Sequence, residues 1–84
     1  MSICEVLVPV FLKLGGVKIY VYGGDHSPPH IHAIHAGKEL LMTIKGREVL
    51  KTKGFKFSEI RAIAKAVALN EQALMEEWYG RNKK

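Results

Sequence analysis

The sequence predicts one small α+β domain, an antiparallel β-meander of four to five strands packed against one or two C-terminal helices. Short segments in the first two thirds of the chain alternate between apolar and polar residues, as strands do. Glycine-containing turns separate these segments, and a helical apolar pattern follows Ser58. With 84 residues, the chain has the size of a single domain, residues 1–84, with a thin core.

The first two strands are expected to form a hairpin. Val17–Tyr22 alternates strictly and is rich in β-branched and aromatic residues, which is typical of a strand. Gly15-Gly16 provides a turn that joins it to Val6–Leu14. Pro9 lacks a backbone donor and therefore indicates that the first strand lies at a sheet edge.

Three further strands complete the predicted meander. The turns between them are expected at Ala36–Lys38 and Lys45-Gly46, and the strands at His30–Ala36, Glu39–Ile44 and Arg47–Lys51. In the middle one, Leu40, Met42 and Ile44 share a face, as a core requires.

The C-terminal third predicts helix. Ser58 is a suitable N-cap, and Glu59 favours the positive end of the helix dipole. A break near Asn70 is favoured over one continuous helix, with Gly80 as the end and residues 81–84 as a frayed basic tail. The apolar stripe consists of Ile60, Ile63, Ala64, Val67, Leu74 and Trp78, and both Trp78 and Phe57 are expected in the core.

Composition narrows the function classes. A 48% apolar and 25% charged chain is ordinary for a globular protein and excludes intrinsic disorder. The single cysteine, Cys4, excludes a disulfide scaffold and favours a reducing, cytoplasmic setting. The apolar segment Ile3–Leu14 is interrupted by charges and is too short to cross a bilayer, so no membrane partner is expected.

The net charge of +5 is concentrated in residues 37–65, which carry eight basic and three acidic side chains. A basic band on strands and turns is able to hold phosphates, since such contacts depend mainly on charge density. The candidate phosphate-binding residues are Lys45, Arg47, Lys51 and Lys53. The alternative is an ordinary solvated face of a basic protein.

All four histidines lie between Asp25 and His35. On a strand from His30 to Ala36, His30 and His32 project from one face and His35 from the other. Asp25 and His26 come from the preceding Gly- and Pro-rich loop, where functional groups are often displayed.

This cluster permits three interpretations. His30 and His32 are suited to accept and donate a proton in metal-independent cleavage of RNA, with Asp25 orienting His26. Tyr20 or Tyr22 would then stack on a base. Alternatively, His26, His30 and His32, with Asp25, offer the ligand types for a divalent transition metal. The third interpretation is purely structural, with histidines that bond the turn backbone.

The same segment resembles a known family. The sequence matches a Gly-x-x-Ile-x-x-Tyr strand, an Asp-His-x-Pro-Pro-His-x-His-Ala run and a helix with Leu-x-x-Glu-Trp. The residues concerned are Gly16, Ile19, Tyr22, Asp25, His26, Pro28, Pro29, His30, His32, Ala33, Leu74, Glu77 and Trp78. This pattern is similar to that of the small bacterial family called domain of unknown function 4160.

The resemblance implies no established activity. It does imply an association with toxin–antitoxin-type gene pairs, and therefore a partner that is RNA or a small protein encoded by an adjacent gene. The Lys-rich segment Arg47–Lys56 departs from the commoner family pattern, so phosphate binding there is not implied for the family.

The sequence as a whole favours a toxin–antitoxin-type component that acts on or binds RNA through its histidines and basic band. The alternative is a non-enzymatic module that binds a metal or a protein partner. Whether the chain is an enzyme stays open at this point.

Overall fold

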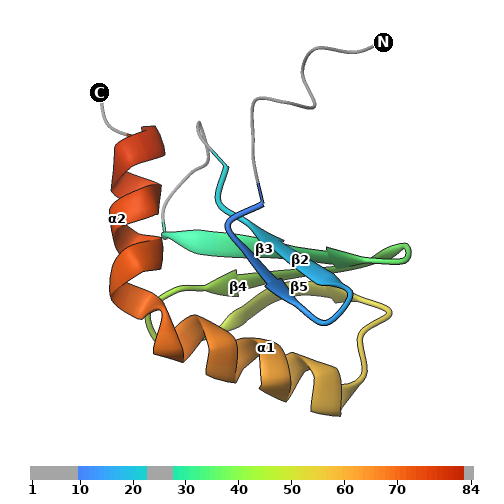
Figure 1. The fold of residues 1–84 in the computed structure, drawn as a ribbon. Coiled ribbons are helices and arrows are strands. Elements are labelled where there is room, and N and C mark those ends of the chain that lie inside the picture. Colours follow the sequence, from blue (N-terminus) through green and yellow to red (C-terminus); the bar gives the residue numbers. More distant parts are fainter. Residues whose placement is uncertain (1–9, 23–27, 83–84) are drawn as a thin grey trace, which may run out of the picture.

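The computed structural model describes residues 10–22 and 28–82. In this part of the chain, five strands precede two helices (Figure 1). The strands are β1 (Leu12–Leu14), β2 (Val17–Tyr20), β3 (His30–His35), β4 (Lys38–Thr43) and β5 (Val49–Lys53), and the helices are α1 (Phe57–Leu69) and α2 (Glu71–Asn82). The predicted α+β meander with C-terminal helices is confirmed.

The five strands form one antiparallel sheet in the order β1-β2-β3-β4-β5. The predicted hairpin between the first two strands is present, and β1 begins at Leu12 in the described part. Residues 6–9 of the expected first strand lie outside the described residues.

The last strand begins later than the sequence predicts, at Val49 instead of Arg47. The reason is a longer turn, in which Gly46 and Arg47 both have positive φ angles, 84° and 51°. The Thr43 hydroxyl holds this turn, because it donates to the Lys45 carbonyl and accepts the Glu48 backbone N–H, both at 2.8 Å.

Helix α1 begins at Phe57, so the prediction of Ser58 as N-cap is wrong. The N-cap is Lys56, whose backbone N–H donates to the Glu59 carboxylate at 2.7 Å. That bond closes the helix end without a small polar cap residue.

The predicted break at Asn70 is confirmed, since this residue separates the two helices and its amide donates to the Ala66 carbonyl at 2.8 Å. The expected end at Gly80 is wrong, because α2 continues through Asn82. There the Asn82 amide donates to the Trp78 and Tyr22 carbonyls, at 3.0 and 3.2 Å. Neither described helix has the length and apolarity needed to cross a membrane.

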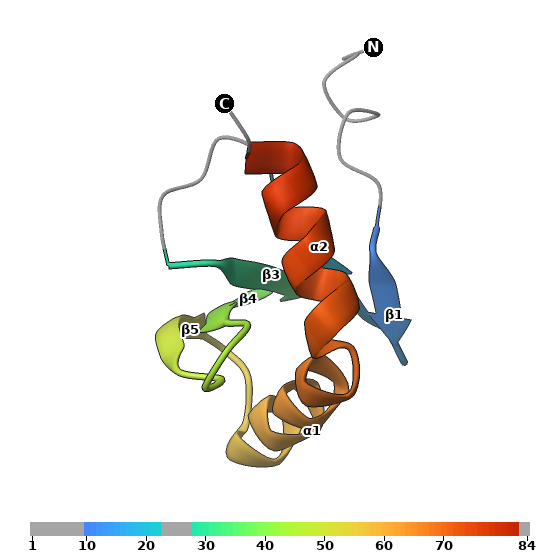
Figure 2. The same cartoon turned by 90° about the vertical axis from the view of Figure 1, so that its left-hand side faces the viewer.

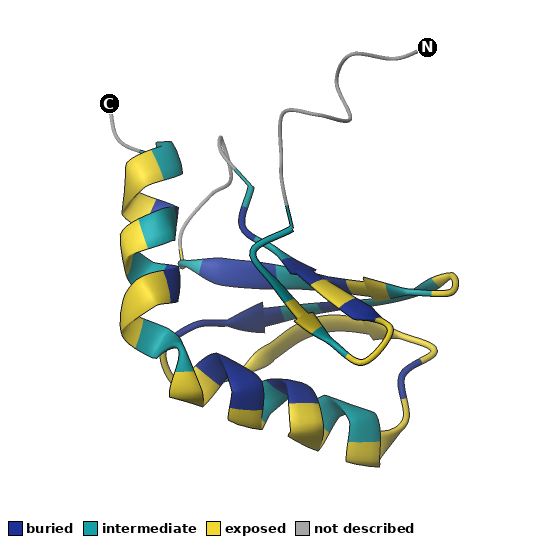
Figure 3. Ribbon diagram, in the orientation of Figure 1, coloured by how far each residue is buried: buried dark blue, intermediate teal, exposed yellow. Residues whose placement is uncertain are grey.

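The core lies between one face of the sheet and the two helices (Figures 1 and 2). Figure 3 shows the buried residues of the strands and helices in dark blue. Buried Trp78 confirms the prediction for that residue. Phe57 is 74% exposed and Phe55 takes the expected core place, so the prediction for Phe57 is wrong. At the first helical position, Phe57 faces outward, with the Arg61 guanidinium 5.8 Å from the centre of its ring.

Candidate nucleic-acid interface

The same strands that build the core present a different chemistry on their other face. Ile19, Ala33 and Leu40 are opposite one another in the register and fully buried. The intervening residues must therefore point away from the helices. We call this surface the open face; it consists of Lys13, Lys18, Tyr20, Tyr22, His32, Ile34, Glu39, Leu41, Lys51 and Lys53.

Aromatic rings form a continuous row along the open face. The Tyr20 and Tyr22 ring centroids are 5.7 Å apart, and those of Tyr22 and His32 are 4.3 Å apart. His30 follows at 5.1 Å from His32, and Trp78 of α2 at 5.2 Å from His30. This ring row (Tyr20, Tyr22, His32, His30, Trp78) runs from the exposed sheet surface into the core, and its exposed end is suited to stack on planar ligands.

His30 is the buried member of the histidine pair, with 8% of its surface exposed. It lies at the beginning of β3, where α2 places Trp78 against it. Its Nδ1 is 2.8 Å from the Pro28 carbonyl, which accepts hydrogen bonds only, so Nδ1 carries the proton. This bond fixes the orientation of the ring.

His32 is half-buried and faces outward between Tyr22 and His30. The expectation that His30 and His32 share a face is met by their ring contact. His32 is the member of the pair that lies on the accessible surface.

His35 takes no part in this site. Its Nδ1–H donates to the Gly16 carbonyl at 2.8 Å, which ties the end of β3 to the turn between β1 and β2. A Cβ added at Gly16 would collide with the imidazole ring of His35. The structural interpretation, in which histidines bond the turn backbone, describes His35 and also the bond of His30 to the Pro28 carbonyl.

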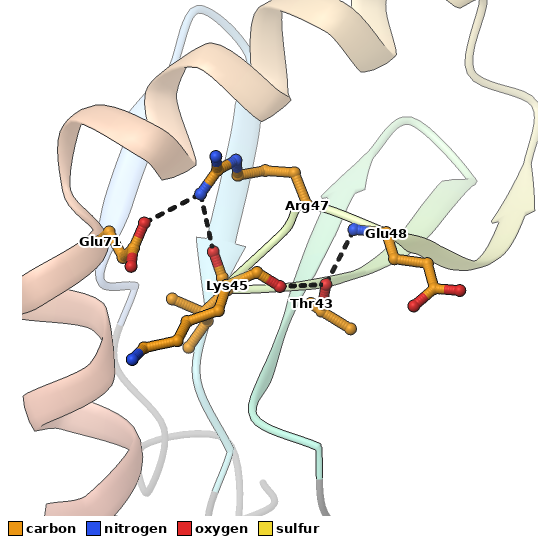
Figure 4. Close-up of polar contacts among 6 residues, drawn as sticks. Thr43, Lys45, Arg47, Glu48 and Glu71 are labelled. Atoms are coloured by element: carbon orange, nitrogen blue, oxygen red, sulfur yellow. Dashed lines mark hydrogen bonds and ion pairs between the residues drawn. The ribbon is translucent and has the colours of Figure 1, made fainter.

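The predicted basic band is divided between two places. Lys51 and Lys53 lie on the open face, where Lys51 is 3.7 Å from the Glu39 carboxylate. Arg47 lies in the turn between β4 and β5, where its guanidinium contacts Glu71 at 2.9 Å and the Ile44 carbonyl at 3.3 Å (Figure 4). Lys45 is in the same turn, exposed.

Two further cations of the open face were missed by sequence reasoning. Lys13 and Lys18 are opposite each other in the β1–β2 register and point to the same side as Tyr20. In the described part of the chain, no ion pair involves either of them. The strict alternation of Val17–Tyr22 places Lys18 on the same face as Tyr20 and Tyr22, although Lys18 was not among the predicted phosphate-binding residues.

Asp25 and His26, which the sequence proposed as an orienting pair and as metal ligands, lie outside the described residues. Among residues 10–22 and 28–82, no group of three His, Cys, Asp or Glu side chains is arranged to hold a metal ion. The contact between His30 and His32 is the part of the predicted site that the structure brings together.

A hollow that the sequence did not indicate lies between the β4–β5 turn and α2. Its volume is about 280 Å³, and we call it the α2 groove; its lining is Pro28, Pro29, Thr43, Lys45, Glu48, Met75 and Tyr79. A second, more open hollow of about 440 Å³ adjoins it and shares Lys45, Met75 and Tyr79. The groove depends on the crossing of α2 over the sheet end, which a sequence pattern does not specify.

Fold and site together define a small α+β domain whose sheet is covered by helices on one face and carries rings and lysines on the other. Residues 16–79 match the family model of Domain of unknown function (DUF4160). The chain belongs to this family, as its sequence motifs predicted. Neither the curated proteins nor the solved structures contain a significant match to the chain.

Proposed function

We propose that this protein binds single-stranded RNA on the open face of its sheet. The observation that carries the proposal is the coincidence of the ring row with four lysines on one surface. Stacking rings and a basic track are the two components that single-strand binding surfaces combine.

The rings favour unpaired bases. Tyr20, Tyr22 and His32 are half-buried, so each is held in place while part of its ring stays accessible. Unpaired bases offer their flat faces to such rings, whereas bases in a duplex are stacked on one another. A single strand is therefore the better ligand.

The charges favour a polyanion. Lys13, Lys18, Lys51 and Lys53 are distributed over both edges of the sheet, and Glu39 is the one acidic side chain of the open face. Strands lie about 4.8 Å apart, so the distance from β1 to β5 is roughly 19 Å. A strand of RNA crossing the rings would meet lysines at both ends of its path.

Salt-dependent binding of a 12-nucleotide single-stranded RNA, followed by fluorescence anisotropy, tests the charge component. Each phosphate contact contributes about 0.7 to the slope of log affinity against log salt concentration. Lys18→Gln should lower the slope by about this amount. The matched control is Lys65→Gln, an exposed lysine on α1, which should leave it unchanged. Equal effects of the two variants would contradict the proposed surface.

The ring component is tested separately with Tyr20→Ala and Tyr20→Phe. Loss of one stacked base costs about 1–3 kcal/mol, so the alanine variant should bind the RNA at least about fivefold more weakly. The phenylalanine variant keeps the ring and should bind nearly as the parent does. A loss in both variants would assign the effect to the hydroxyl group instead of stacking.

Cleavage of the bound RNA is the finer form of this proposal. The ring centroids of His30 and His32 are 5.1 Å apart, and the bond of His30 Nδ1 to the Pro28 carbonyl fixes the orientation of one ring of the pair. In such a reaction, one imidazole takes the proton of a ribose 2′-hydroxyl, whose oxygen attacks the adjacent phosphorus. The bond from phosphorus to the 5′ oxygen breaks, and the other imidazolium protonates that oxygen.

The products would be a 2′,3′-cyclic phosphate and a free 5′-hydroxyl. His32→Ala and His30→Ala should each abolish the cyclic product, with unfolding curves recorded to show that both variants fold. Full cleavage activity in both variants would exclude this mechanism. The proposal that the open face binds RNA would still stand.

The remaining hypotheses concern other partners. Metal binding by His26, His30 and His32 stays a prediction, tested by metal analysis of untagged protein beside a His30→Ala/His32→Ala variant. Membership of a toxin–antitoxin-type pair also stays a prediction. Co-purification with the protein encoded by the adjacent gene tests it.

A further inference from the structure

We infer that the α2 groove is a pocket for one nucleotide of the bound RNA, with its phosphate at Lys45 and its base against Tyr79 and Met75. This inference rests on the proposed RNA-binding function and deepens it. The preferred occupant is a nucleotide whose base has an exocyclic amine, such as a cytidine nucleotide.

The walls of the groove suit a flat, mostly apolar group. Tyr79 is 60% exposed, and Met75 is half-buried and packs on the edge of the core. Pro29 provides a rigid wall from the sheet side. A volume of about 280 Å³ lies just below the usual range for ligand pockets, which favours one small planar ligand.

Lys45 supplies the charge for a phosphate. It lines both the α2 groove and the adjoining hollow, and no ion pair involves it in the described residues. The neighbouring cation, Arg47, is engaged by Glu71 (Figure 4). Lys45 is therefore the cation of this turn that is available to an anionic ligand.

Glu48 sets the preference for the base. Its side chain leaves the turn in the direction opposite to that of Lys45 (Figure 4), and Thr43 fixes its backbone at 2.8 Å. An ionised carboxylate accepts hydrogen bonds only. It pairs with the N4 amine of cytosine, whereas uracil would place its O4 acceptor at the same position.

The groove adjoins the buried end of the ring row, formed by His30 and Trp78. His30 and Thr43 are opposite each other in the β3–β4 register, and Tyr79 follows Trp78 on α2. The two residues that precede β3, Pro28 and Pro29, line the groove. The groove therefore lies at the same end of the sheet as the buried end of the ring row, where His32, whose ring contacts His30, is the partly exposed ring.

The test is an NMR titration of protein with ¹³C-labelled methionine methyl groups. The Met75 methyl reports on the groove, and the Met42 methyl, buried in the core, is the internal control. The probes are cytidine monophosphate, uridine monophosphate and cytidine. Cytidine monophosphate should shift the Met75 signal and leave that of Met42 in place.

Three comparisons then assign the contacts. Uridine monophosphate should bind roughly tenfold more weakly than cytidine monophosphate, the low end of what a hydrogen bond to a charged group contributes. Glu48→Gln should remove this difference, because an amide both donates and accepts. Lys45→Gln should weaken cytidine monophosphate binding about fivefold and leave cytidine binding unchanged.

The outcomes separate the inference from the function on which it rests. If the 12-nucleotide RNA binds but the Met75 signal does not respond to any of the three probes, the groove is not a nucleotide pocket and the open-face proposal stands. Equal binding of both monophosphates overturns the role of Glu48 and the stated preference. If the RNA itself fails to bind, the proposed function is wrong.

Discussion

The two faces of the sheet are made by the same strands and have opposite properties. On the covered face, Ile19, Ile31 and Leu40 are completely buried against the helices. On the open face, the alternating residues include two tyrosines, His32 and four lysines, most of them partly or fully exposed. Neighbouring residues in one strand therefore lie in different environments, one in the core and the next on the open face.

Under the proposed function, this difference separates the residues that stabilise the domain from those that would bind RNA. The core is made by one face of a single sheet and two short helices, so it buries little apolar surface in total. The loss of buried apolar groups there should therefore lower the free energy of unfolding strongly. The open face contributes ring contacts but few buried atoms. Substitutions one position apart along β3 are thus expected to have contrasting effects.

The largest expected effect is at Ile31. Ile31→Ala removes completely buried methyl groups and should lower the free energy of unfolding by about 2–5 kcal/mol. The adjacent His32→Ala loses a half-exposed ring contact and should cost about 0.5–1.5 kcal/mol. Urea denaturation measures both.

Ile31→Val provides a milder change in case the alanine variant does not fold, with an expected loss of about 0.5–1.5 kcal/mol. Its RNA affinity should equal that of the parent, while His32→Ala should weaken RNA binding. If Ile31→Val alters affinity more than His32→Ala does, the division between the two faces is wrong.

The second effect concerns the contact between Gly16 and His35. Gly16→Ala forces a Cβ into the imidazole ring and should cost about 1–3 kcal/mol. In a His35→Ala background this collision is gone, so the same change should cost much less. A double-mutant cycle from urea denaturation measures the coupling.

The control for that cycle is Gly15→Ala. Gly15 has a φ of 60° and open space around its Cα, so its substitution strains the backbone by about 1–2 kcal/mol whichever residue is at position 35. Coupling of Gly15 to His35 as strong as that of Gly16 would refute the proposed collision.

The smallest effect is the pH dependence contributed by Glu59 on the covered side. The pKa of its carboxyl group lies below the ordinary value of 4.5, because the group accepts the Lys56 backbone N–H and also the Lys38 ammonium, 3.0 Å away. A lowered pKa in the folded state stabilises the fold above pH 4.5, and this contribution is lost as the pH falls through the folded-state pKa.

Glu59→Gln should therefore be less stable than the parent at neutral pH, with a difference that shrinks below pH 4.5. Lys38→Gln should retain part of that pH dependence, since the Lys56 N–H remains. Thermal unfolding from pH 3 to pH 7 measures it. A parent–variant difference that is constant over this range would show that the two hydrogen bonds do not favour the carboxylate.

Much of the fold was predictable because it follows from local pattern. Alternation in Val17–Tyr22 placed β2, and the apolar stripe with Asn70 placed two helices. The features that were not predicted depend on tertiary contacts. The β4–β5 turn keeps Arg47 at positive φ while Glu71 of α2 holds its side chain, and Glu59 caps α1 in place of a small polar residue.

The site was predictable to the same degree. Strand alternation placed His30 and His32 together, and the ring contact agrees. The inclusion of Lys13 required the β1–β2 register, and the contact of His30 with Trp78 required the path of α2. The sequence pattern predicts which residues share one face of a strand. Tertiary packing determines which residues of other elements contact them.

An NMR map of the protein on addition of single-stranded RNA tests the central claim most directly. The account predicts that the side-chain signals of Tyr20, Tyr22 and His32 shift together, while those of Ile63 and Val67 on the covered side do not. Shifts confined to the exposed surface of α1, with the three rings unaffected, would contradict it.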